Sequence, residues 1–182
     1  DQPRSRGLGD VYKRQIIEGT AIAKDFTHIY ASSFYYNEHG EPCWPAQVIN
    51  YTNKTQFLFR IEKGILDIND NAVNDHFAEG ELRVPFRNIV YIGDSATDIP
   101  CMRLVNSLGG HSVGVYDLEN TDSKDTVCRM IRDERIRYYV PADYTKGSEM
   151  DTLMHWIIDK TAAYEVLEEK HLRDRKEAVG LK

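Results

Sequence analysis

The sequence predicts an α/β protein, in which a Rossmann-like parallel sheet carries helices on its faces. From residue 88 onward, short apolar runs of strand length alternate with longer segments of helical periodicity, which is typical of strand–helix–strand units. The run "NIVYI" at 88–92 is nearly continuous in apolar residues, as in a strand covered on both faces. With 182 residues, the chain is long enough for one such core.

Residues 1–15, "DQPRSRGLGDVYKRQ", differ from the rest because they are polar and show no helix or strand periodicity. Asp10 to Gln15 can be written GAT GTG TAT AAG AGA CAG, which resembles the mosaic-end sequence recognised by the transposase of sequencing-library preparation. We therefore interpret residues 1–15 as translated adaptor and expect the native sequence to begin at about Ile16, within a longer protein. The alternative is a disordered N-terminal arm.

The segment from Ile16 predicts a short helix followed by a hairpin. Residues 16–26 favour the helix, and residues 28–36 are rich in aromatic and β-branched side chains, with a turn after them. Residues 41–51 suit the returning strand, although Pro42 and Pro45 favour an edge or irregular position.

A second helix is expected after Thr52 or Asn53, either of which suits the N-cap, and Gly64 stands where a helix would stop. Residues 66–86 are acidic and irregular, which predicts a surface loop. Beyond this loop the strands and helices alternate. The expected elements are a strand at 88–92, a helix at 98–110, a strand at 111–117, a helix at 122–133, a strand at 136–144 and a long helix at 147–180.

Composition limits the partners and the compartment. A net charge of −6 argues against a nucleic-acid surface, which needs a basic face. No apolar run approaches the roughly 18 residues that a membrane span needs. Cys43, Cys101 and Cys128 are widely spaced and form no metal-binding pair. They predict reduced thiols in a cytoplasmic protein, each buried as a small apolar side chain.

Two aspartates follow the first regular strand, in "NIVYIGDSATDIPCM". Asp94 comes directly after the strand, with Gly93 giving the chain room to turn, and Asp98 lies about one turn further on, at the start of a helix. Ligands of open parallel sheets bind at the carboxyl ends of the strands. Two carboxylates there would form a hard-oxygen site that suits Mg²⁺, and Mg²⁺ suits phosphate. Alternatively, Asp94 only ends the strand and Asp98 only caps the helix.

Lys54 is a further candidate. It lies in the first turn of its helix, where the helix dipole disfavours a cation by about 0.3–1 kcal/mol. A lysine at this place adds to the anion-binding character of a helix N-terminus. The alternative is an exposed lysine tolerated at small cost.

Lys54 at a helix start, followed downstream by "IVYIGDSATDIPCM", resembles the third and fourth motifs of the haloacid dehalogenase superfamily, in its phosphoserine-phosphatase-like branch. The hairpin "IYASSFYYNEHGEP" is similar to the segment that these phosphatases carry before the lysine. The resemblance covers about residues 16–165, as a partial hydrolase core. Residues 166–182 remain as a charged helical tail.

The resemblance implies a Mg²⁺-dependent phosphatase that hydrolyses a small phosphorylated metabolite through an aspartyl-phosphate intermediate. Asp94 would be the Mg²⁺ ligand, and Asp98 would be its partner, acting directly or through water. Lys54 would be catalytic and phosphate-binding, because it would neutralise the phosphoryl group and the attacking carboxylate. Thr97 takes the position at which some relatives carry Asn near the phosphate, which implies a phosphate-binding role.

Half of the family's catalytic set is absent from this sequence. The resemblance places the nucleophilic Asp-x-Asp strand, the second-motif Ser or Thr and the specificity cap before Ile16. The core would then lack its first two strands, and the strand at 88–92 would expose an apolar edge. We therefore expect the parent protein to be a phosphatase and this chain to be inactive.

Two other functions stay open. "IGDSATD" resembles the first block of a GDS-type serine esterase with Ser95 as nucleophile, but in that family the block stands early and is followed by Asp-x-x-His, whereas Asp151 and His155 are one residue further apart. A non-catalytic Rossmann-like binding domain is the third possibility. No strand is followed by G-x-G-x-x-G, which argues against dinucleotide binding.

Overall fold

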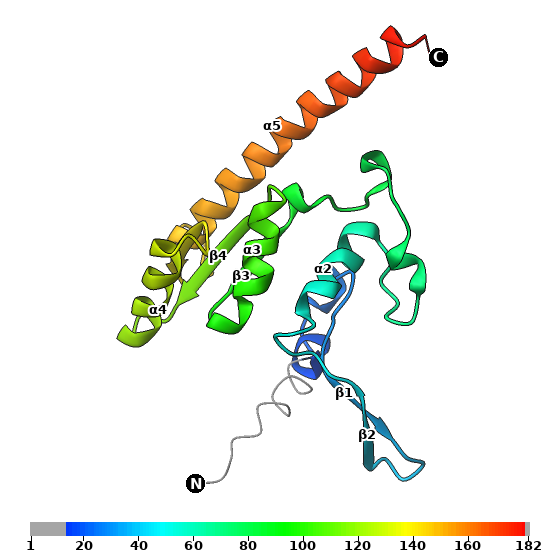
Figure 1. Cartoon of the computed structure of the whole chain (residues 1–182). Coiled ribbons are helices and arrows are strands. Elements are labelled where there is room, and N and C mark those ends of the chain that lie inside the picture. Colours follow the sequence, from blue (N-terminus) through cyan, green and yellow to red (C-terminus); the bar gives the residue numbers. More distant parts are fainter. Residues whose placement is uncertain (1–13, 181–182) are drawn as a thin grey trace. The chain divides into compact units, whose positions relative to one another are not determined.

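A computed structural model describes residues 14–180. Of the segment interpreted as adaptor, residues 1–13 lie outside the described residues. Figure 1 shows the order of the elements along the chain. The described chain forms two compact units that divide between Phe77 and Ala78.

The first unit opens with helix and turn, then a hairpin. The expected helix at 16–26 is wrong in its second half: helical structure runs over 14–18 and only a 3₁₀ turn, η1 (Ala23–Asp25), follows. The hairpin is confirmed, because β1 (Ser33–Tyr36) pairs antiparallel with β2 (Pro42–Gln47). Of the strand expected at 28–36, only residues 33–36 belong to this hairpin.

Helix α2 (Lys54–Lys63) begins after Asn53 and ends at Gly64, as expected. Gly64 adopts a left-handed conformation with φ of 73°, and its N–H donates to the carbonyls of Arg60 and Ile61. A residue with a side chain would be strained in this conformation, so the glycine ends the helix. Asn53 does not cap α2 through its side chain, whose amide donates to the carbonyl of Val48 instead.

The acidic segment after α2 is irregular, as predicted, and contains the 3₁₀ turn η2 (Asn71–Asn74). Two cations of α2, Arg60 and Lys63, order it by donating hydrogen bonds to its carbonyls. The acceptors are Asp67, Ile68 and Asp70 for Arg60, at 2.6–3.1 Å, and Val73 and Asp75 for Lys63, at 2.7–2.8 Å. Arg60 is only 6% exposed, so its bonds replace those that the guanidinium would make to water.

The second unit contains the predicted parallel sheet. Its strands are β3 (Val90–Gly93), β4 (His111–Tyr116) and β5 (Tyr138–Pro141), in the spatial order β3-β4-β5. The helices are α3 (Ile99–Ser107), α4 (Thr121–Arg132) and α5 (Glu149–Ala178), and the short turns are η3 (Glu79–Glu81), η4 (Phe86–Asn88) and η5 (Ala96–Asp98). The sequence therefore predicted the fold class and the strand–helix alternation correctly.

Helices cover both faces of the sheet. Val113 and Val115 of β4 pack against the start of α5, whereas Tyr116 packs against residues of α3 and α4. Neighbouring strand residues point to opposite faces, so the alternation places α5 on one face and α3 and α4 on the other. Every residue of β4 is buried, as expected for the central strand.

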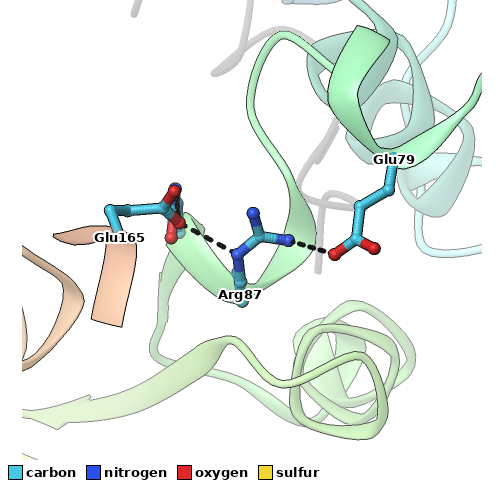
Figure 2. Close-up of polar contacts among 4 residues, drawn as sticks. Glu79, Arg87 and Glu165 are labelled. Atoms are coloured by element: carbon cyan, nitrogen blue, oxygen red, sulfur yellow. Dashed lines mark hydrogen bonds and ion pairs between the residues drawn. The ribbon is translucent and has the colours of Figure 1, made fainter. Parts of the chain in front are cut away.

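Helix α5 is attached to the second unit in two ways. Its first half packs on the sheet through Met150, Leu153 and Ile157, and the rest continues past the sheet (Figure 1). Further along, Glu165 accepts a hydrogen bond from Arg87 of η4 at 2.9 Å, and Arg87 also contacts Glu79 at 2.9 Å (Figure 2). The helix is continuous across residues 165 and 166.

The cysteines differ in burial. Cys101 is fully buried, Cys128 is partly buried and Cys43 is exposed, so the prediction that all three are buried is wrong for Cys43. That residue lies in β2, where the side chains from Pro42 to Ala46 all face solvent. Among residues 14–180, no helix combines the length and the apolar character that crossing a membrane requires.

Candidate functional site at the carboxyl end of β3

The carboxyl ends of β3, β4 and β5 lie along the same edge of the sheet, because the strands are parallel and in register. Asp94 follows β3 directly and its side chain is exposed. The chain then turns through η5 into α3. This edge is where open α/β sheets bind their ligands. The structure therefore places Asp94 and Asp98 at the strand end where the sequence predicted them, and Thr97 lies between them in η5.

Asp98 occupies the N-cap position of α3, but its side chain makes no capping hydrogen bond. Its carboxylate is turned toward β3 instead. The Tyr91 hydroxyl donates to Oδ1 at 2.9 Å, and the Ser95 hydroxyl donates to Oδ2 at 3.1 Å. Asp98 is only 6% exposed. The alternative that Asp98 only caps the helix is therefore wrong, because its side chain does not bond to the helix amides.

The start of α3 explains why the cap is not formed. A capping side chain accepts from the second or third backbone N–H of the helix. The second residue of α3 is Pro100, which has no N–H, so only the amide of Cys101 remains. Tyr91 and Ser95 offer two hydroxyl donors instead of that one amide.

Gly93 allows the Asp98 side chain to lie against the strand. A Cβ atom at position 93 would stand 2.8 Å from Cβ of Asp98 and 2.9 Å from its Oδ2. Contacts this short do not occur between real side chains, so any larger residue would displace the Asp98 carboxylate. The glycine therefore serves the packing of Asp98, in addition to the turn that the sequence predicted.

Burial raises the pKa of the Tyr91 hydroxyl far above its ordinary value of 10, and the negative charge of Asp98 raises it further. Tyr91 therefore keeps its proton at neutral pH and remains a hydrogen-bond donor.

The hydroxyls of Ser95 and Thr97 lie 2.7 Å apart. Ser95 has one hydroxyl proton and gives it to Asp98, so Thr97 must be the donor in this contact. Tyr91 and Ser95 thus donate to the Asp98 carboxylate, and Thr97 donates to Ser95. Thr97 itself is exposed, and while its hydroxyl proton is directed to Ser95 its oxygen only accepts further hydrogen bonds.

Lys54, the remaining candidate, is the partly buried first residue of α2. It belongs to the first compact unit, whereas Asp94, Thr97 and Asp98 belong to the second. The surroundings of Lys54 are therefore described within the first unit, and those of the three other residues within the second.

The donor set at the end of β3 fits Mg²⁺ in its chemistry. This ion is commonly held by one or two carboxylates, with waters and substrate phosphate completing the shell. The exposed Asp94 suits a direct ligand, and the hydrogen-bonded Asp98 suits an orienting partner. Within residues 14–180, no three His, Cys, Asp or Glu side chains gather into a metal-binding group.

His155, which the esterase hypothesis considered, lies on α5 with its ring exposed. Its Nδ1 contacts the backbone carbonyl of Asp151 at 2.8 Å and the Asp151 carboxylate at 3.5 Å. This pair spans one turn of one helix. Ser95, in contrast, bonds to Asp98 and Thr97.

Reasoning from the sequence missed Tyr91 and the contact of Ser95 with Asp98. A signal for Tyr91 was present, since a tyrosine in a covered strand usually needs a hydrogen-bond partner for its hydroxyl. Pro100 was a second signal, because it removes a donor that the expected cap would use. Which acceptor Tyr91 reaches depends on how α3 packs against β3.

Comparison with known proteins gives one distant similarity. The chain is 24% identical over 161 residues to an uncharacterized protein of Borreliella burgdorferi, and the match covers 81% of this chain. It spans 54% of that relative's length, so the relative is considerably longer. No protein-family model and no solved structure matches the chain.

Proposed function

We propose that this chain is the metal-binding part of a Mg²⁺-dependent phosphatase of the haloacid dehalogenase superfamily, acting on a small phosphorylated metabolite. The observation that carries the proposal is the Asp98 carboxylate, which turns away from its helix and lies beside the strand that ends at Asp94. A residue that only capped a helix would face the helix amides.

In this proposal Asp94 holds the cation and Asp98 orients the site. When bound, Mg²⁺ supplies neutralisation of phosphate charge. As the resemblance implies, Lys54 would contribute a second positive charge to the phosphoryl group. Thr97 would bind a phosphate oxygen by turning its hydroxyl proton from Ser95 toward that oxygen. The nucleophilic aspartate is no part of this chain, so we expect the chain alone to be inactive.

The proposal also concerns the sheet. A haloacid-dehalogenase-like core requires further strands on the open side of β3, including the one that carries the nucleophile. The strand β3 stands at an edge, and Ile92 in it is 41% exposed. An added parallel strand would pair this edge and place its carboxyl end next to Asp94, which supports the proposal.

The test begins with the source locus. Its reading frame is sequenced upstream of the codon for Ile16, and the full protein is expressed. We expect an Asp-x-Asp-x-Thr strand and hydrolysis of p-nitrophenyl phosphate that needs Mg²⁺. Asp94→Asn should lower the rate at least about 100-fold, since even residues that only orient metal ligands cost 10–100-fold. Glu149→Gln, an exposed change on α5, serves as the matched control.

Three results would overturn the proposal. One is a frame without the Asp-x-Asp pair, which would favour a binding domain. Another is a frame that starts with residues 1–15, which would make the adaptor interpretation wrong. The third is hydrolysis of p-nitrophenyl acetate that Ser95→Ala abolishes, which would indicate the esterase.

A further inference from the structure

We propose that Tyr91 is a positioning residue of this site: its hydroxyl holds the Asp98 carboxylate beside the end of β3 and keeps it from capping α3. The inference rests on the proposed function for the purpose of the carboxylate. The hydrogen bond itself is independent of that function. Tyr91 lies in β3, three residues before Asp94, and its role depends on the packing of this strand against the turn that follows it.

The geometry of the carboxylate carries the inference. Each of its two oxygens receives a neutral hydroxyl donor, Tyr91 at 2.9 Å on Oδ1 and Ser95 at 3.1 Å on Oδ2. Two donors on different oxygens fix both the position of the group and the rotation of its plane. Since the residue is only 6% exposed, these bonds replace those it would make to water.

The two donors differ in how firmly the surrounding structure holds them. Ser95 lies in the turn three residues before Asp98, and its hydroxyl also contacts Thr97. Tyr91 lies within β3 and packs with the apolar cluster under α3 and α4. The strand and this packing hold the ring, so the Tyr91 hydroxyl is the fixed reference point to which the carboxylate is attached.

Residues that orient metal ligands through hydrogen bonds typically change metal affinity or activity 10–100-fold when they are removed. Tyr91→Phe removes one oxygen atom and keeps the ring that fills the core. Oδ1 of Asp98 would lose the Tyr91 donor, and we expect the carboxylate to rotate toward the amide of Cys101. The site would then keep both aspartates and lose the orientation of one.

The experiment uses NMR spectroscopy of this chain. The first readout is the γ-carbon signal of Asp98, compared in H₂O and D₂O, because exchange of a bonded hydroxyl proton for deuterium shifts that signal. We expect an isotope shift in the wild-type chain and a smaller one in Tyr91→Phe. The amide of Cys101 should move downfield in the variant as the carboxylate begins to cap α3.

The second readout is Mn²⁺, used as the probe cation, which broadens nearby amide signals. In the wild-type chain we expect broadening at residues 94–98. Tyr91→Phe should weaken this binding by about 10-fold. Ser95→Ala should weaken it too, whereas Ser95→Thr, which keeps a hydroxyl, should restore it. Tyr139→Phe is the matched control, since it removes a hydroxyl from β5 and should change neither readout.

The inference is overturned if Tyr91→Phe leaves the Asp98 signal, the Cys101 amide and the Mn²⁺ affinity as in the wild-type chain. A wild-type chain without the isotope shift would also overturn it, and this measurement needs no variant to fold. If Mn²⁺ broadens no signal at residues 94–98, the proposed cation site fails, and the Asp98 signal still decides the role of Tyr91.

Discussion

The two edge strands of the parallel sheet, β3 and β5, differ in the residues at which they end and in what lies beside them. Strand β5 ends at Pro141, whose nitrogen has no proton to offer a further strand. A groove of about 470 Å³, lined by β5 residues and by Ile131 and Trp156 among others, runs beside it. Strand β3 ends in Gly-Asp, has no proline and exposes 41% of Ile92.

This difference shows which edge strand carries a feature that blocks further pairing. Natural sheets protect their edges with short strands, proline or charge, because an unprotected apolar edge pairs with other chains. Both edge strands are short, with four residues each, but only β5 contains proline. The β3 edge lacks proline and charge within the strand, and it is the strand that carries the candidate site. In the proposed function, an additional strand at β3 would cover this edge and carry the nucleophile next to Asp94.

The largest effect is expected at the end of β3. Gly93→Ala places a Cβ 2.8 Å from the Cβ of Asp98, and overpacking of this kind costs about 1–3 kcal/mol. The free energy of opening, measured by hydrogen exchange of the β4 amides, should fall by that amount. Gly80→Ala is the control, because its Cβ would meet no atom within 4 Å. Equal stability of the two variants would show that Asp98 is not held against the strand.

The second prediction compares how a charge on each edge strand changes self-association of the chain. Ile92→Lys puts a charge on the β3 edge, and Tyr139→Lys puts one on the β5 edge, where Tyr139 is 37% exposed. If β3 is the unprotected edge, Ile92→Lys should slow self-association on the order of tenfold, and Tyr139→Lys should change it little. Light scattering at several concentrations measures both. A larger effect from Tyr139→Lys would reverse the comparison.

The smallest effect concerns pH on the β5 side. His111 is 2% exposed, and its ring stacks on the ring of Tyr138 in β5, with 6.0 Å between the two ring centroids. Burial, and then the charges of Lys160 and Arg137, lower the pKa of His111. The unfolded chain therefore binds more protons, so this contribution to stability is complete above about pH 6.5 and is lost as the pH falls toward the lowered pKa.

Hydrogen exchange of β4 and β5 amides at about pH 7.5 and pH 5.5 tests this effect on either side of the ordinary histidine pKa. His111→Gln should remove part of the acid destabilisation. His155→Gln is the control with the opposite sign, since the Asp151 carbonyl raises the pKa of the exposed His155. A wild-type chain whose β5 amides exchange equally at both pH values, after correction for intrinsic rates, would contradict the prediction.

The sequence predicted most of the regular structure because the signals were local. Gly64 ended α2 as expected, and the apolar runs placed β3 and β4. The helix expected at 16–26 failed, since its apolar residues do not find a surface to cover: Ile16 and Ile22 are 66% and 55% exposed. Helical propensity without such packing is weak.

The segment after α2 marks another limit. Its polar residues predicted an irregular loop, which was confirmed, but not the way in which Arg60 and Lys63 gather its carbonyls. Backbone carbonyls are present at every residue, so the sequence does not distinguish those that will meet a cation. Only the path of the folded loop decides which ones do.

By itself, the sequence determined that this chain builds a parallel sheet between helices, and that Asp94 and Asp98 stand at the carboxyl end of a strand. Both follow from periodicity and from neighbours along the chain. Only the tertiary structure decided that Asp98 turns from its helix to Tyr91 and Ser95, and that β3 and β5 are the two edge strands of the sheet within residues 14–180. The physical reason is that a hydrogen bond or a covered edge requires a partner at a particular place in space, and that place is set by packing.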